Sequence, residues 1–129
     1  MAQTLDQQRA QFAWNAVTQA RQAIKEFSDY KNLAKGAPAL VMGNGLMPAI
    51  AFYESRKKSA PASGLGNNIL AWLAIRFKDE RAFQPLPSNF STAMERLLKA
   101  DSEFYMRATE ETLSMLKWVR QFADAVEGS

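Results

Sequence analysis

The stretch ALVMGNGLMP, residues 39–48, decides between two folds for this chain. Its Asn44-Gly45 pair is a common signal for a tight β-hairpin when alternating apolar residues flank it. Here the flanks do not alternate, because a continuous apolar run precedes the pair and Pro48 interrupts the other side. We therefore interpret the stretch as a corner between two helices, where glycine permits a positive φ and Leu46 returns to the core.

Helical spacing recurs on both sides of this corner. Thr4 and Gln7 have the form of a capping box, which predicts a helix start. Gly36 is expected to end one short segment and Pro38 to begin another. Helices are expected at about 5–27, 29–35, 38–42, 46–58, 65–78, 91–99 and 102–126, with loops at 59–64 and 84–89. The predicted fold is all-α: a compact helical bundle of about five to seven helices, one domain over 1–129, with 1–3 and 127–129 frayed.

The composition is typical of one soluble domain. Apolar residues make up 47% of the 129 positions, which is enough for a core. There is no cysteine, the first thirty residues lack the apolar stretch of a signal peptide, and no run approaches the ~20 apolar residues of a membrane span. We therefore expect a cytoplasmic protein without a membrane partner.

The residue types argue against an enzyme. Histidine and cysteine are both absent, so the commonest general base and a structural zinc site are missing. The Gly43–Gly45 stretch lacks the third glycine of a dinucleotide fingerprint, because Pro48 stands there. Glu110 and Glu111 diverge by about 100° on a helix and do not form an acid–base pair. We expect no catalytic residue, no metal and no cofactor, although a nuclease with acidic residues and Mg²⁺ is the formal alternative.

One basic stripe on the first predicted helix suggests an anionic partner. Residues 1–81 carry eleven basic and six acidic side chains, whereas the remainder carries five and seven. Trp14, Thr18, Arg21 and Lys25 follow one another at spacings of 4, 3 and 4, so they share one polar face. Cations suit the phosphates of a single-stranded nucleic acid, and a flat ring suits its bases. The alternative is that another part of the domain covers Trp14.

A second basic cluster, Arg56, Lys57 and Lys58, ends the helix that follows the corner. It is a further candidate for nucleic-acid contact. The simpler explanation is that cations at a helix C-terminus complement the helix dipole, and the two interpretations are compatible.

Trp118 lies on the last predicted helix, roughly opposite its core face. Leaving an indole in water is costly, since a buried aromatic covers ~150–250 Å². Either this helix lies between two layers of the domain, or Trp118 contacts a partner subunit. We predict Trp118 as a protein-interface residue.

The stretch Pro38–Phe52 resembles the small helical subunit of the Cmr (type III-B) CRISPR effector complex. That family carries a proline, then apolar residues, then Asn-Gly-Leu, then Ala-x-Ala-Phe at the opening of a helix. Residues 105–123 resemble the last helix of the family, and Trp72-Leu73 suits its middle helix. The resemblance therefore covers the chain from the first helix to about Ala125.

The resemblance implies a non-catalytic structural subunit. It implies stacking in a short filament along the backbone subunits, with other Cmr subunits and copies of this chain as partners. It also implies contacts to the backbone of guide RNA and target RNA, whose base pairing reads the sequence. The alternative is a protein-only helical adaptor in a multisubunit assembly. The residues expected to contact RNA come from the two basic clusters and not from the family: Trp14, Arg21, Lys25, Arg56, Lys57 and Lys58.

Overall fold

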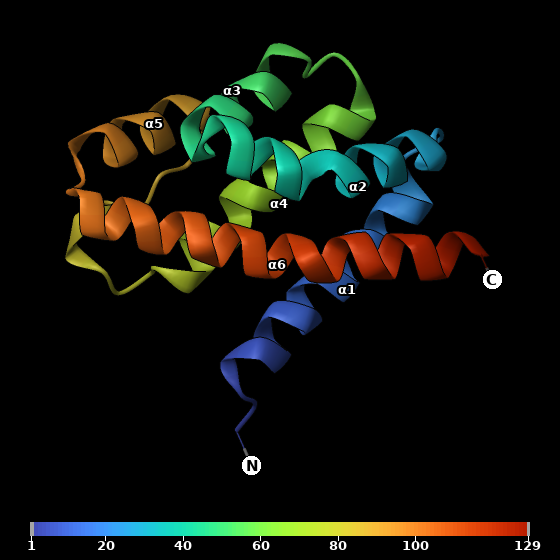
Figure 1. Ribbon diagram of the computed structural model, residues 1–129, viewed down its shortest axis with the longest axis horizontal. Coiled ribbons are helices and arrows are strands. Elements are labelled where there is room, and N and C mark those ends of the chain that lie inside the picture. Colours follow the sequence, from blue (N-terminus) through green and yellow to red (C-terminus); the bar gives the residue numbers. More distant parts are fainter. Residues whose placement is uncertain (1, 129) are drawn as a thin grey trace.

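A computed structural model describes residues 2–128, which form six α-helices and one short 3₁₀ helix (Figure 1). The elements are α1 Leu5–Ala23, α2 Phe27–Asn44, α3 Leu46–Ser55, α4 Ala60–Arg76, η1 Arg81–Phe83, α5 Phe90–Lys99 and α6 Ser102–Gly128. No strand occurs in the described part of the chain, so the predicted all-α bundle of five to seven helices is confirmed. Of the ends predicted to fray, Met1 and Ser129 lie outside the described residues.

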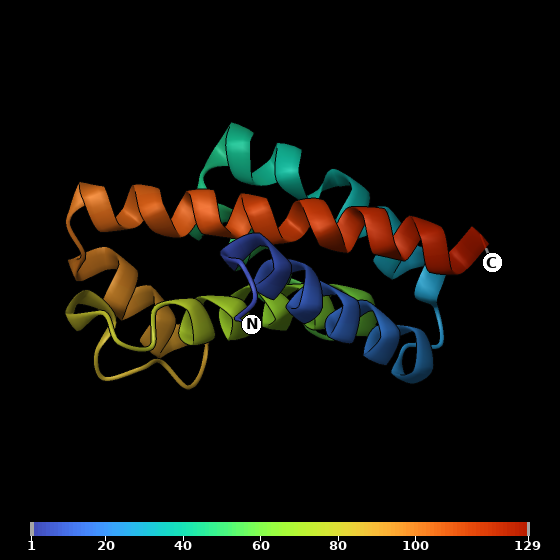
Figure 2. The same cartoon turned by 90° about the horizontal axis from the view of Figure 1, so that it is seen from below.

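The long helix α6 organises the bundle. It packs against α1, α2 and α4, and Figure 2 shows α1 lying obliquely across it. Its buried positions recur every three or four residues, as a helix with one core face requires. These are Phe104, Ala108, Glu111, Thr112, Met115, Leu116, Val119 and Ala123. At the start of α6, the Phe104 ring lies 4.9 Å from Phe77 and 5.6 Å from Phe83, which fastens η1 to the end of α4.

The corner between α2 and α3 forms as the sequence predicts. Gly45 has a φ of 99°, which an L side chain rarely adopts, and Leu46 is fully buried. The first helical amides of α3 lack partners within the helix, and one of them is satisfied by α6: Met47 N donates to the Tyr105 hydroxyl at 3.0 Å. The corner is thereby fixed to the longest helix of the domain.

The predicted break at 36–37 is wrong, because α2 continues through Gly36 and Pro38. Proline inside a helix removes a hydrogen bond and normally bends or ends it. Here Ala34, Ala37 and Val41 are all buried at helical spacing, since α2 packs against both α4 and α6. Tertiary burial therefore outweighs the local preference.

The predicted loop at 59–64 is also wrong, because α4 begins at Ala60. Pro61 occupies the first turn, where its missing N–H costs nothing. The small residues permit close helix packing: a Cβ added at Gly64 would meet Ile24 at 3.0 Å, and one added at Gly66 would meet Tyr53 at 3.0 Å. A composition that is typical of a linker here forms the contact surface of a helix.

Candidate nucleic-acid interface

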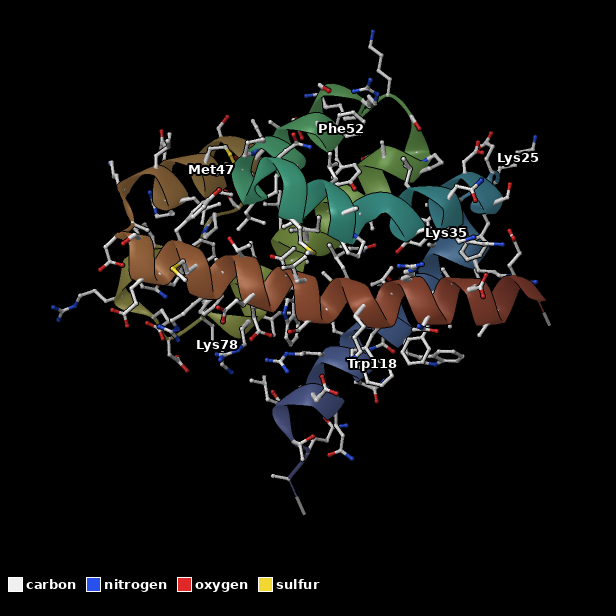
Figure 3. All side chains as sticks on the ribbon, in the orientation of Figure 1. Lys25, Lys35, Met47, Phe52, Lys78 and Trp118 are labelled. Carbon is white, nitrogen blue, oxygen red and sulfur yellow. The ribbon has the colours of Figure 1, made fainter. Side chains whose placement is uncertain are left out.

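The turn that joins α3 to α4 presents Arg56, Lys57 and Lys58, all exposed. The Arg56 guanidinium lies over the Phe52 ring, 4.0 Å from its centre, and Figure 3 places Phe52 at this edge of the molecule. Lys57 Nζ lies 3.2 Å from Glu54 Oε2. Lys58 forms no ion pair with any residue between 2 and 128. The turn is therefore the basic cluster that the sequence indicates, with one side chain stacked, one loosely paired and one unpaired.

Lys57 and Lys58 border a groove of about 540 Å³ between α1 and the first half of α4. Small side chains leave space for the groove, and polar side chains line it. The small residues are Ala16, Ala20, Ala23, Ala60 and Gly64, and the polar ones include Gln19, Ser63, Asn67 and Asn68. At its base, Tyr30 Oη donates to Asn68 Oδ1 at 2.7 Å, and burial raises the pKa of Tyr30 well above its usual value. The phenol therefore keeps the proton that it donates.

The predicted stripe on α1 runs along the seam with α6. The Trp14 side chain is 43% exposed, and its ring meets Phe122 edge-on with 5.3 Å between centres. Arg21 Nη1 donates to the carbonyl oxygen of Val126, near the end of α6. Lys25 is exposed in the turn after α1, toward the upper right of Figure 3. Trp14 and Arg21 thus make contacts within the domain, and Lys25 is the open cation of the stripe.

The structure does not bring the two basic clusters into one site. Successive helical residues turn by about 100°, so Trp14 and Arg21 lie about 160° around the α1 axis from Ala16 and Ala23 respectively. Ala16 and Ala23 line the groove that Lys57 and Lys58 border. The stripe and the groove therefore lie on nearly opposite faces of α1.

Trp118 is half-buried on the same seam between α1 and α6. Its ring stacks on Phe122 with 5.5 Å between centres, and its Nε1 donates to Asp6 Oδ1 at 3.1 Å. That hydrogen bond is the largest cause of a lowered pKa for the Asp6 carboxyl. The N-terminal turn of α1 thus covers part of the indole, and the contact of Trp118 with a partner subunit stays a prediction.

Comparison with known proteins identifies the family. Residues 5–126 match the family model described as CRISPR-associated protein (Cas_Cmr5). This chain belongs to the Cmr5 family. It is therefore a subunit of the Cmr (type III-B) CRISPR complex, as the resemblance at residues 38–52 implies.

A solved structure from the Cmr5 family agrees with the fold. The crystal structure of a CRISPR-associated Cmr5 family protein from Thermus thermophilus is similar to this chain with a TM-score of 0.74 and 28% sequence identity. The match covers 95% of this chain and 97% of that one. The whole helical bundle is thus shared with that Cmr5 protein.

A buried charged cluster in this Cmr5-family chain joins three helices and was missed by the sequence analysis. Glu111 of α6 is only 5% exposed and accepts hydrogen bonds from Arg9 Nε at 2.7 Å and Arg9 Nη2 at 2.9 Å, both from α1. From α4, Trp72 Nε1 donates to Glu111 at 3.2 Å, and Arg76 Nε lies 3.2 Å from its other oxygen as an ion pair. The cluster ties α1, α4 and α6 together.

The protonation state of Glu111 follows from these neighbours. Burial raises the pKa of the Glu111 carboxyl, but the hydrogen bond from Arg9 and the charges of Arg9 and Arg76 outweigh burial. The pKa of Glu111 therefore lies below its usual value, and the side chain is ionised at neutral pH. Its place on the core face, in register with Ala108 and Met115, is the sequence signal that could have found it.

Among residues 2–128, every helix is too short or too polar to span a membrane. No group of three or more histidine, cysteine, aspartate or glutamate side chains among them is placed to hold a metal ion.

Proposed function

We propose that this Cmr subunit is a non-catalytic structural protein that stacks along the backbone subunits of the complex and contacts the guide–target RNA through its phosphates. The observation that carries the proposal is the groove between α1 and α4 with Lys57 and Lys58 at its border. Both lysines are exposed, and Lys58 has no ion pair within the described residues. The charge of Lys58 is therefore available to a partner, and that of Lys57 is shared with Glu54.

The chemistry of the groove suits a nucleic-acid backbone. Lysine ammonium groups neutralise phosphates and release counterions, which supplies affinity without regard to sequence. Gln19, Ser63 and Asn67 add hydrogen-bonding groups for phosphate and sugar oxygens. Small, exposed side chains such as Ala23 and Ala60 let a backbone approach the groove closely. Sequence-independent contact is what a guided complex requires, because base pairing reads the target.

The residues of the α1 stripe are candidate RNA contacts that we expect to contribute less to RNA affinity. Lys25 is exposed and open to a partner. Trp14 and Arg21 already make contacts with α6, so their rearrangement would have a cost. We expect their replacement to weaken RNA binding less than replacement of Lys57 and Lys58.

The test is RNA binding by the reconstituted Cmr complex as a function of salt. With Lys57→Ala/Lys58→Ala, we expect weaker binding to all target sequences and a salt slope reduced by about 1 for each phosphate that the variant no longer neutralises. Lys78→Ala is the matched control, because Lys78 is an exposed lysine away from the groove, on the lower side of Figure 3. An unchanged affinity and salt slope in the double variant would reject the contact.

A protein-only adaptor is the second candidate, and exposed apolar side chains favour it. Large apolar side chains remain exposed at Met42, Ile75, Leu86, Leu98 and Met106. Contact with a protein partner would remove this apolar surface from water. Crosslinking in the assembled complex separates the two functions. Crosslinks from this subunit to RNA support the proposal, and crosslinks only to other subunits support the adaptor.

The absence of catalysis has its own test. The isolated chain is incubated with labelled RNA and Mg²⁺, and we expect no cleavage above the protein-free control. Metal-dependent turnover that persists through purification would overturn this part of the proposal.

A further inference from the structure

A second basic hollow lies on the seam between α2 and α6. It measures about 160 Å³, and every residue that lines it is polar. The lining residues are Lys31, Lys35, Arg120, Gln121 and Asp124. Figure 3 shows Lys35 beside this seam. Because α2 and α6 are distant in sequence, spacing along the chain could not join these side chains.

The charges of the hollow are only partly balanced. Lys31 Nζ lies 2.6 Å from Glu127 Oε1 and 3.6 Å from Asp124 Oδ1, so this one lysine engages both nearby carboxylates. The hydrogen bond to Glu127 is the main reason that the pKa of Lys31 is raised. Lys35 and Arg120 are exposed, and neither forms an ion pair with any residue from 2 to 128. Three cations thus face two carboxylates, which leaves a net charge of +1, and Lys35 and Arg120 have no ion pair of their own within the described residues.

We propose that Lys35 and Arg120 bind a phosphate group of an RNA backbone in this hollow. The planar guanidinium of arginine donates two parallel hydrogen bonds to a phosphate, and lysine adds a point charge beside it. The Gln121 amide can donate a further hydrogen bond to a phosphate or ribose oxygen. The set of side chains suits an anion with several acceptor oxygens.

The composition of the hollow favours RNA over an acidic protein surface. Protein interfaces have an apolar core with aromatic or aliphatic anchors, surrounded by a polar rim. None of the large exposed apolar side chains of the described chain lines this hollow. A surface made only of donors and charges is instead typical of backbone contacts to a nucleic acid.

The inference rests on the proposed RNA contact of this subunit and adds a second place for it. The groove near Lys57 lies between α1 and α4, whereas the hollow lies between α2 and α6. One chain would therefore hold RNA at two separate surfaces. Two weak contacts linked by a rigid domain raise the overall affinity more than either contact alone.

The test uses the reconstituted Cmr complex and a labelled target RNA that is complementary to the guide. Lys35→Ala/Arg120→Ala is expected to weaken binding and to lower the salt slope by about 1. Asp124→Asn should act in the opposite direction, because it removes the negative charge beside Arg120. Lys78→Ala is the matched control for removal of an exposed lysine. Unfolding curves of each variant show whether the fold is retained.

The outcomes separate this inference from the proposed function. An unchanged salt slope in Lys35→Ala/Arg120→Ala, with a retained effect of Lys57→Ala/Lys58→Ala, overturns the hollow alone. If Lys35→Ala/Arg120→Ala lowers the salt slope and Lys57→Ala/Lys58→Ala does not, the RNA contact at the hollow is supported and the contact at the groove is rejected. Loss of another subunit from the complex, with RNA affinity per assembled complex unchanged, assigns the hollow to an acidic protein surface and overturns the inference.

Discussion

The cluster around Glu111 and the turn at 56–58 both gather cations and use them in different ways. In the cluster, the guanidinium groups of Arg9 and Arg76 converge on one buried carboxylate. In the turn, the exposed Lys57 has one half-buried partner, Glu54, and Lys58 has none within the described residues. Burial and pairing therefore distinguish charges that hold this fold from charges that are open to a partner.

The two arrangements also differ in how much they contribute to the free energy of unfolding. Removing one partner from a buried ion pair leaves an uncompensated charge and costs about 3–5 kcal/mol. A surface pair such as Lys57 with Glu54 contributes about 0–1 kcal/mol. Variants of the cluster should therefore change the free energy of unfolding, and variants of the turn should change binding.

The largest expected effect is that of Glu111→Ala. The change leaves the guanidinium groups of Arg9 and Arg76 without their carboxylate, and we expect the free energy of unfolding to fall by about 3 kcal/mol. The lower end of the range applies because both arginines keep some contact with water. Urea unfolding measures this change in the free energy of unfolding.

Glu110→Ala is the matched control on an exposed neighbouring position. Its free energy of unfolding should stay within about 0.5 kcal/mol of wild type. Equal losses in the two variants would contradict the comparison.

Arg9→Lys keeps the positive charge next to Glu111 and changes its geometry. Arg9 donates two hydrogen bonds to Glu111, and a lysine cannot reproduce this planar fork. We expect a loss of about 1–2 kcal/mol in the free energy of unfolding. A loss as large as that of Glu111→Ala would show that the fork, and not the charge, holds the cluster.

The pH dependence of stability isolates Glu111. Its pKa in the folded chain lies below the usual value of 4.5, because the arginines outweigh burial. The stabilisation is therefore fully present above pH 4.5 and is lost as the pH falls through the lower folded value. Asp6 and Glu80 also have lowered pKa values, so they contribute in the same window. We expect wild type to lose more stability than Glu111→Gln between about pH 6 and pH 3, and parallel curves would exclude Glu111 as a source.

The smallest expected effect on stability is that of Lys57→Ala/Lys58→Ala. Both side chains are exposed, so the free energy of unfolding should change by less than about 0.5 kcal/mol while the salt slope of RNA binding falls. Thermal unfolding and RNA titration of the same preparation measure the two quantities. A large loss of stability would place these lysines with the fold instead of with the partner.

Local chemistry made part of this molecule predictable. The corner at Gly45 and the helix start at Thr4 depend on a few neighbouring residues, and both form as the sequence indicates. The turn at 56–58 is contiguous in sequence, so its basic cluster was visible before the fold. These features need no information from distant parts of the chain.

Long-range packing determined the features that the sequence did not predict. The continuity of α2 through Pro38 and the early start of α4 at Ala60 depend on burial against other helices. The pairs Arg9 with Glu111 and Lys35 with Arg120 each join residues from distant helices. Such pairs become visible only when the helices are placed together.

The most direct test of the account is a map of RNA crosslinks in the assembled Cmr complex. Thiouridine-substituted target RNA is irradiated in the complex, and the crosslinked peptides of this subunit are identified by mass spectrometry. We predict crosslinks in the peptides that carry Lys57 and Lys58, and none at Arg9 or Arg76. Crosslinks confined to other subunits, or concentrated on the cluster around Glu111, would contradict it.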